Sequence, residues 1–296
     1  MKTRILSGLI MAPLLVLVFV GGYILTAACL LIGIFTAYEF YHAFGIRLKT
    51  AVVITIVLSV LLYLTLFINT SFIMLWIFLT VGVSLLLLFK PKKYELQDSF
   101  VLMAGNFYIV FFVFHVPLIV YTFFGGIQHV VDPVWIALFT DDAVHFGRDV
   151  WPILYSNPVW LVLFTAFGTD IFAYFIGVTF GKHKLCPDLS PKKSIEGAVG
   201  GILGSAIVCG LFGWFARPEI FVHCIVIGLL GSIFAQFGDL SASAIKRKLG
   251  VKDYSKLIPG HGGILDRFDS VLFTAPFVYY YLNILGYVKA FTAAVG

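Results

Sequence analysis

The sequence predicts an all-α polytopic membrane protein. Of its 296 residues, 60% are hydrophobic and only 12% are charged, whereas about 25% charged residues is usual in soluble globular domains. A helix needs about 20 consecutive apolar residues to cross a bilayer. Nine segments come close to or exceed that length, at roughly 5–21, 22–45, 51–68, 71–89, 99–124, 158–180, 196–216, 219–237 and 270–289.

The first apolar segment has two features of a secretion signal. Lys2 and Arg4 precede it, and the stretch from Leu25 to Cys29 weakly resembles a lipoprotein cleavage box. Against cleavage, the apolar sequence continues to Phe44 without a polar break. We therefore expect the segment to be retained as membrane helix.

The distribution of basic residues predicts the orientation. With a cytosolic N-terminus, 17 of the 20 lysines and arginines fall on the inner side, and only Arg148, Arg217 and Lys289 fall outside. This asymmetry follows the positive-inside rule. It predicts a multi-pass protein of the inner (plasma) membrane whose inner loops face the cytoplasm.

We divide the chain into N-terminal transmembrane helices (1–125), an external loop (126–157) and a C-terminal catalytic transmembrane region (158–296). The loop carries four acids against the single base Arg148, which suits the outer side: Asp132, Asp141, Asp142 and Asp149. The four cysteines show no paired spacing, so they indicate neither a disulfide framework nor a zinc site. The N-terminal helices carry no polar motif that indicates a specific chemistry.

Asp170 lies in the middle of the sixth predicted helix. An ionisable residue at that depth is costly and is by default a candidate functional residue, with structural pairing as the alternative. Tyr174, Gly177 and Gly181 follow on the same helical face. Asp170 is therefore expected to line a polar cavity or to support helix packing.

The inner loop from Gly181 to Gly197 carries four lysines. A P-loop is excluded, because three residues separate Gly177 from Gly181 and His183 stands where Ser or Thr is required. Ordinary positive-inside charge explains the lysines, and Ser190 before Pro191 resembles a capped helix start. The glycines at 197, 200, 201 and 204 have the spacing of close helix packing, which we favour over phosphate binding.

The stretch from Ser243 to Asp269 is the densest polar block. Asp239 closes the eighth predicted helix, and Asp266 and Asp269 open the ninth. Residues three apart on a helix are neighbours, so Asp266 and Asp269 could share a hard cation such as Mg²⁺. Salt bridges to the neighbouring bases are the alternative.

Cations and glycines accompany these acids. Lys246, Arg247, Lys252 and Arg267 offer phosphate contacts, and the turn from Gly260 to Gly263 could expose backbone N–H groups to an anion. His261 within it is more often a hydrogen-bonding loop residue than a catalyst. Such a set suits metal-assisted phosphoryl or nucleotidyl transfer.

The polar block resembles the signature of the phosphatidate cytidylyltransferases (CDP-diacylglycerol synthases) through all 27 positions from Ser243 to Asp269. The matching residues are Ser243, Lys246, Arg247, Lys252, Asp253, Pro259, His261, Gly262, Gly263, Asp266, Arg267 and Asp269. Residues upstream are similar to a block of the bacterial members: Asp170, Ala173, Tyr174, 181–185, Ser190, Pro191, Lys193, Glu196 and Gly197. Two positions depart from the pattern, with Ser194 where Thr is usual and Ala242 where many members have Glu.

The resemblance implies an enzyme that condenses CTP with phosphatidic acid to give CDP-diacylglycerol and pyrophosphate, with its active site at the cytoplasmic ends of the C-terminal helices. It implies catalytic roles for Asp170, Asp239, Asp266, Asp269 and His261. Mg²⁺ would be held by Asp239, Asp266 and Asp269, and a second cation stays open. Substrate contacts are expected from Ser190, Lys193, Ser194, Ser243, Lys246, Arg247, Lys252, Asp253 and Arg267.

CTP, phosphatidic acid and membrane lipids are the expected partners, without nucleic acid, and a homodimer stays open. One alternative enzyme transfers from CTP to another lipid phosphate or phosphorylates a polyprenol. An ion-coupled transporter using Asp170 is an alternative of another class. It would require paired interrupted helices in two related halves, and the sequence has no such symmetry.

Overall fold

The computed structural model describes residues 16–18, 21–46, 48–123, 157–257 and 262–295. Most of the predicted first helix (5–21) and nearly all of the predicted external loop (126–157) lie outside them. The chain forms two compact units. Unit 1 contains Met1–Asp132 and Ile245–Phe268, and unit 2 contains Pro133–Ala244 and Asp269–Gly296.

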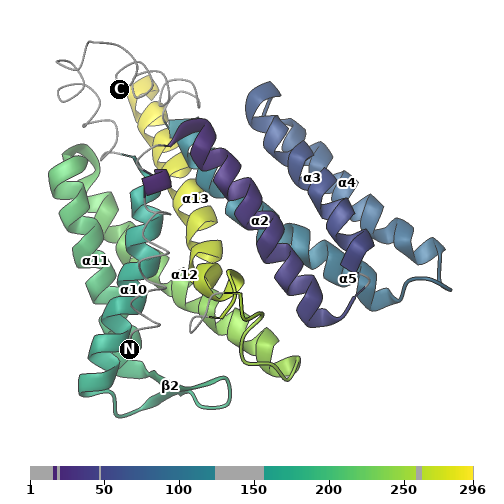
Figure 1. Cartoon of the computed structure of the whole chain (residues 1–296). Helices are drawn as coiled ribbons and strands as arrows, with labels where there is room; N and C mark the ends of the chain where they lie inside the picture. The colour runs from purple at the N-terminus through teal and green to yellow at the C-terminus, as the bar shows by residue number, and fades with distance from the viewer. Residues whose placement is uncertain (1–15, 19–20, 47, 124–156, 258–261, 296) are drawn as a thin grey trace, which may run out of the picture. The chain divides into compact units, whose positions relative to one another are not determined.

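Both units are helical, as predicted, and Figure 1 labels their main elements. The first described helices are α2 (Gly22–Phe44), α3 (Leu48–Ile68), α4 (Phe72–Leu86), η1 (Leu87–Phe89), α5 (Leu96–Ala104), the π-helix η2 (Gly105–Phe111) and α6 (Phe112–Phe123). The later elements are α10 (Val159–Phe180), β1 (Lys184–Cys186), β2 (Ser190–Ser194), α11 (Ile195–Ala216), η4 (Pro218–Ile220), α12 (Phe221–Lys248) and α13 (Leu265–Val295).

Within the described residues, seven helical segments are long and apolar enough to cross a membrane. They correspond to the second through eighth predicted segments. The predicted ninth segment, 270–289, lies inside α13, which is 31 residues long but is not among the seven. The polytopic fold is confirmed, whereas the count of nine stays a prediction.

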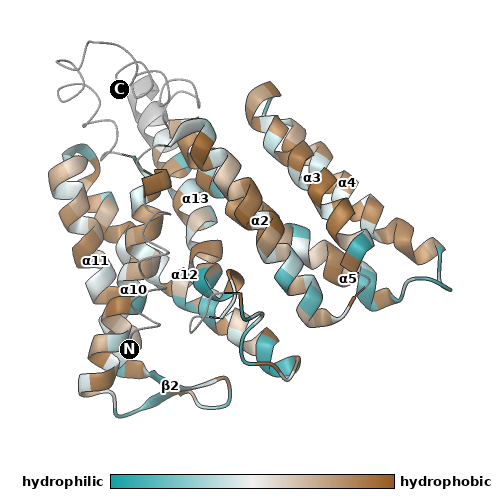
Figure 2. Cartoon of the chain, viewed as in Figure 1, coloured by the Kyte–Doolittle hydropathy of each residue, from teal (hydrophilic) through white to brown (hydrophobic). Residues whose placement is uncertain are grey.

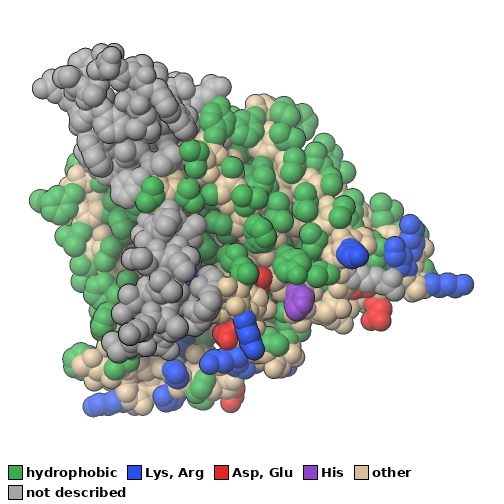
Figure 3. All heavy atoms as spheres, in the orientation of Figure 1, with side chains coloured by type: hydrophobic (Ala, Val, Ile, Leu, Met, Phe, Trp, Pro, Cys, Tyr) green, Lys and Arg blue, Asp and Glu red, His purple; other side chains and the backbone are tan. Residues whose placement is uncertain are grey.

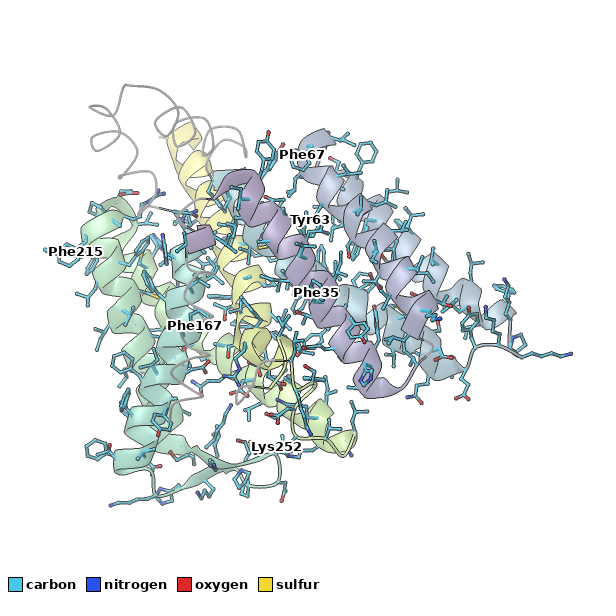
Figure 4. All side chains as sticks on the ribbon, viewed as in Figure 1. Phe35, Tyr63, Phe67, Phe167, Phe215 and Lys252 are labelled. Carbon is cyan, nitrogen blue, oxygen red and sulfur yellow. The ribbon has the colours of Figure 1, made fainter. Side chains whose placement is uncertain are left out.

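Large apolar side chains cover much of the surface of these helices (Figure 3). Phe78 is 75% exposed and Phe215 is 77% exposed, and Phe35 and Phe67 also stand on the outside of their helices (Figure 4). Contiguous exposed apolar surface of this kind marks contact with lipid or with protein. It agrees with helices that span a bilayer.

Polar contacts inside unit 1 fix α2 against α3 and η2. The Tyr41 hydroxyl hydrogen bonds the Thr55 hydroxyl at 2.8 Å, and Asn106 Nδ2 donates to Tyr41 at 3.2 Å. A Cβ added at Gly105 would lie 2.3 Å from the Tyr41 ring, so glycine permits this approach. The polar ring of Tyr41 thus sets the position of the C-terminal part of α2.

The connections of unit 1 that carry its basic residues meet at one end of that unit. Tyr94, which follows Lys92 and Lys93, donates from its hydroxyl to Thr50 Oγ1 at 3.2 Å, next to Lys49. The polar connection from α12 to α13 contacts the same end of α2, because Ser255 Oγ donates to Glu39 Oε1 at 2.6 Å. In Figure 2 this connection is a concentration of hydrophilic residues.

In unit 2, α10 and α11 pack through glycines. A Cβ added at Gly197 would lie 2.8 Å from the Ala173 carbonyl oxygen, and one at Gly201 would lie 2.9 Å from the Thr169 carbonyl oxygen. Small residues at this spacing let helix backbones approach closely in lipid. The packing interpretation of these glycines is therefore confirmed.

Candidate active site

Helix α12 runs eleven residues past the predicted end at 237, as far as Lys248. The predicted boundary was wrong because hydropathy marks where apolar residues stop, while a helix can continue with basic residues favoured by the dipole of its last turn. Asp239, Ser243 and Lys246 therefore stand on one helix at spacings of four and three residues. That spacing places them along one stripe of α12.

In unit 1, Lys246 and Asp266 form a buried ion pair. Lys246 Nζ lies 2.7 Å from Asp266 Oδ1, and the two residues are only 8% and 7% exposed. Asp266 Oδ2 also accepts from the Tyr254 and Gly263 backbone N–H groups, each at 2.9 Å. Lys246 Nζ lies 5.5 Å from the centre of the Tyr254 ring, so the Lys246 ammonium and the Asp266 carboxylate belong to one buried cluster with Tyr254 and Gly263.

Two glycines allow the close packing of this cluster. Gly262 has φ of +83°, a conformation that other residues rarely adopt, and a Cβ there would lie 2.8 Å from Asp266 Oδ2. A Cβ at Gly263 would lie 2.5 Å from Glu39 Oε2. The Gly263 N–H, which the sequence suggested for binding an anion, donates to the protein's own Asp266.

Glu39 of α2 belongs to the same cluster, and it was not among the predicted residues. Its Oε1 accepts from Ser255 Oγ and from the Ile264 N–H at 3.0 Å, and its Oε2 accepts from the Leu265 N–H at 2.9 Å. The side chain is buried, with 3% exposure. A signal was available, because Glu39 is a lone acid in a long apolar segment, the same criterion that selected Asp170.

In unit 2, a short hairpin brings Lys193 to α12. Strands β1 and β2 pair antiparallel, with Lys184 opposite Ser194. Lys193 Nζ forms an ion pair with Asp239 Oδ2, and Ser243 Oγ donates to Asp239 Oδ1 at 3.4 Å. The predicted residues Lys193, Asp239 and Ser243 are thus brought together.

The hairpin ends at the capped start of α11. Ser194 has extended backbone geometry, and its Oγ accepts from the Gly197 N–H at 3.1 Å. The cap is therefore Ser194, and Ser190, which the sequence suggested, lies at the start of β2 instead. Glu196 accepts from the Lys182 N–H at 3.0 Å and from the His183 side chain at 2.6 Å, so it ties the start of the loop to α11.

Asp170 is exposed on α10 and lies within reach of the base of α13. Ser270 Oγ donates to Asp170 Oδ2 at 3.2 Å. Asp269 Oδ1 accepts from the Ser270 N–H at 2.8 Å and is itself buried, with 7% exposure. Asp170, Ser270 and Asp269 form a second polar group of unit 2.

The remaining predicted residues differ in exposure and in hydrogen bonding. Lys252 and Asp253 are exposed on the connection between α12 and α13, where Figure 4 labels Lys252. Arg247 is exposed, and its Nη1 donates to the Val251 carbonyl at 3.3 Å. Arg267 is partly buried, and its Nε has no hydrogen-bond partner within the described part of the chain. His261 lies outside the described residues.

The predicted Mg²⁺ ligands are carboxylates, which are the donors that this hard cation prefers. Among the residues that the structure describes, no three His, Cys, Asp or Glu side chains are grouped so that they could hold a metal ion. Asp266 already accepts from Lys246 and two backbone N–H groups. Mg²⁺ in such sites is usually held by one or two carboxylates together with substrate phosphates. The donor chemistry of Asp266 and Asp269 suits such a site, and the three-carboxylate metal site stays a prediction.

Comparison with known proteins defines the class of protein. A family model described as the cytidylyltransferase family matches residues 2–285, so the chain belongs to that family. The expected resemblance is thereby confirmed.

Individual relatives of the chain support the same family. A phosphatidate cytidylyltransferase of Synechocystis sp. is 34% identical over 95% of this chain and 96% of its own length. A phosphatidate cytidylyltransferase of Bacillus subtilis is 48% identical, over 38% of this chain and 43% of the relative. One of Staphylococcus haemolyticus is 43% identical, over 49% of this chain and 50% of the relative. The chain therefore matches half or less of the last two relatives.

Proposed function

We propose that the chain is a phosphatidate cytidylyltransferase, which joins CTP to phosphatidic acid and releases pyrophosphate. Family membership across residues 2–285 and the full-length Synechocystis relative support this activity. The observation that carries the assignment to residues is the polar stripe of α12, where Asp239 pairs with Lys193 and Lys246 pairs with Asp266. The phosphatidate oxygen attacks the α-phosphorus of CTP in line, and the bond to pyrophosphate breaks.

The cationic side chains bind and orient the phosphates. Lys193 is about a quarter exposed, with a side-chain exposure of 28%, so its ammonium remains accessible to a ligand. Arg267 carries a buried Nε without a partner in the described chain, and an anionic oxygen would satisfy it. Arginine provides a bidentate fork for phosphate. Arg247 in the last turn of α12 and Lys252 on the connection after it are both exposed and extend the same positive charge.

Asp239 holds Lys193 and Asp266 holds Lys246, and the carboxylates of the site would also hold the metal. Bound Mg²⁺ would neutralise charge on the reacting phosphates. Asp269 and Asp266 stand three residues apart at the start of α13, a spacing that places their carboxylates on one helical face. Asp170 is exposed and accepts a hydrogen bond from Ser270, and we assign it to the contact with the lipid headgroup.

The active site faces the cytoplasm from the inner membrane in this proposal. Two observations support it: the basic connections of unit 1 meet at one end of that unit, and the polar connection contacts the same end of α2. A lipid phosphate at headgroup level and CTP from the cytosol both reach such a location.

The test is incubation of the purified protein with labelled CTP, phosphatidic acid and Mg²⁺. A lipid-extractable CDP product together with pyrophosphate is the expected result. A phosphorylated lipid together with CDP would instead identify a lipid kinase. Recovery of unchanged CTP and phosphatidic acid, from protein that remains folded, would refute the proposed reaction.

A further inference from the structure

Glu39 is a buried carboxylate from a part of the sequence with no other candidate chemistry. It lies five residues before the end of α2 and accepts hydrogen bonds from one hydroxyl and two backbone N–H groups. All three donors belong to the stretch from Ser255 to Leu265, which is 216 or more residues later in the chain. Glu39 and these donors lie within unit 1.

The Glu39 carboxylate draws little stabilisation from α2 itself. Glu39 lies more than one turn before the end of α2, where the helix dipole has little effect, and burial of a carboxylate is costly unless it is hydrogen-bonded. The start of α13 offsets that cost, because its first N–H groups lack partners within their own helix. Glu39 thus serves α13, where a negative charge is favourable.

The contact reaches the predicted site directly. Leu265, which donates to Glu39, precedes Asp266, and Asp266 holds Lys246. Gly263 lies between the two carboxylates, since its N–H donates to Asp266 and its Cα faces Glu39. Phe40, the next residue of α2, packs near Tyr254 with ring centres 6.3 Å apart. Two adjacent residues of α2 therefore hold the segment that carries Asp266.

We propose that Glu39 is a positioning residue for cytidylyl transfer, which acts by fixing the start of α13 and through it the Lys246–Asp266 pair. This proposal rests on the proposed function. It assigns a role in the reaction to a residue of the N-terminal helices, without requiring Glu39 to touch either substrate.

The first experiment compares Glu39→Gln with Glu95→Gln. Glu95 is the matched control, because its carboxylate also accepts a backbone N–H at the start of a helix, in this case α5. It lies far from the polar block in the sequence. Glutamine at 39 must turn an amide donor toward Ser255, Ile264 or Leu265. We expect kcat to fall on the order of 100-fold, as misplacement by about 1 Å can cause, while KM for CTP changes little. Glu95→Gln should retain wild-type kcat.

The second experiment is a double-mutant cycle with Gly263→Ala. Gly263 does not have positive φ, so alanine is resisted by Glu39 Oε2 rather than by backbone strain. We expect Gly263→Ala to lower kcat strongly in the wild type but by less than about twofold when Glu39→Ala has removed the carboxylate, since contacting residues are not additive. If Glu39→Ala does not fold, Glu39→Asp takes its place, because the shorter side chain also makes room.

Two results would overturn the proposal: wild-type kcat in Glu39→Gln, or multiplicative effects in the cycle. Trypsin separates this proposal from the proposed function, because Lys252 and Lys256 are exposed on the segment that Glu39 holds. If the wild type makes no CDP-lipid, the proposed reaction fails and cleavage decides the positioning role alone. Cleavage several-fold faster in Glu39→Gln than in Glu95→Gln supports it, and equal rates refute it.

Discussion

Lys246 and Asp266 join the last turn of α12 to the first turn of α13, with Nζ 2.7 Å from Oδ1. Each is at a favourable helix end, because a cation suits a C-terminus and an anion suits an N-terminus. The polar connection between the helices is thus closed at its base by a buried ion pair. The same pair places an ammonium and a carboxylate beside the backbone of Tyr254 and Gly263.

Replacing Lys246 by Met should destabilise unit 1 strongly. Removal of one partner from a buried pair leaves an uncompensated charge and costs about 3–5 kcal/mol. Lys248→Met is the control, since Lys248 is exposed on the same last turn. The measurement is the melting temperature in detergent. Equal melting of the two variants would show that the pair contributes little to stability.

Asp266→Asn and Asp269→Asn should each reduce turnover by orders of magnitude while the protein still inserts. Asparagine keeps the shape but removes the anionic oxygen that suits Mg²⁺. CTP should remain bound measurably through Lys and Arg contacts. Turnover is followed across a Mg²⁺ titration, and near-normal rates in both variants would remove the metal assignment.

Asp170→Asn should lower turnover substantially without preventing folding, if the acid serves a polar cavity. Ser270→Ala removes the hydroxyl that donates to Asp170, so it tests the hydrogen bond without changing the charge. We expect a smaller loss for Ser270→Ala than for Asp170→Asn. Turnover and melting temperature are measured together, and a melting loss without a turnover loss would assign Asp170 a structural role.

Single cysteines at Lys92, Lys192 and Lys256 should be protected from an impermeant thiol reagent in intact cells. All three lysines are exposed in the structure, so protection would report the membrane side rather than burial. The natural cysteines are replaced first, and permeabilised cells provide the control for reactivity. Labelling of two or more positions from outside would reverse the orientation.

Sequence reasoning predicted most helices and the residues of the polar block, because apolar runs and charges are local signals. It misplaced the end of α12, since helix geometry continues through Ser243 and Lys246 where hydropathy falls. It also missed Glu39. Its place as a lone acid in an apolar segment was a local signal that it has a function, but its partners, more than 200 residues away, could not be identified from the sequence.

The β1–β2 hairpin was also not predicted. The stretch from Lys184 to Ser194 contains prolines and lysines, which are poor strand formers. Its geometry depends on tertiary contacts, because Glu196 holds Lys182 and His183 at one end and Asp239 holds Lys193 near the other. The sequence therefore identified the charged loop but not the shape that delivers Lys193.

The hydrogen bonds from Ser255, Ile264 and Leu265 to Glu39 limit the modularity of this protein. A C-terminal fragment beginning near residue 157 would contain the whole polar signature but would leave the first N–H groups of α13 without their acceptor. Grafting that signature onto another helical scaffold therefore requires a carboxylate supplied from elsewhere in the host. The segment that carries the signature depends on α2 for its fold, and it cannot be transferred alone to another protein.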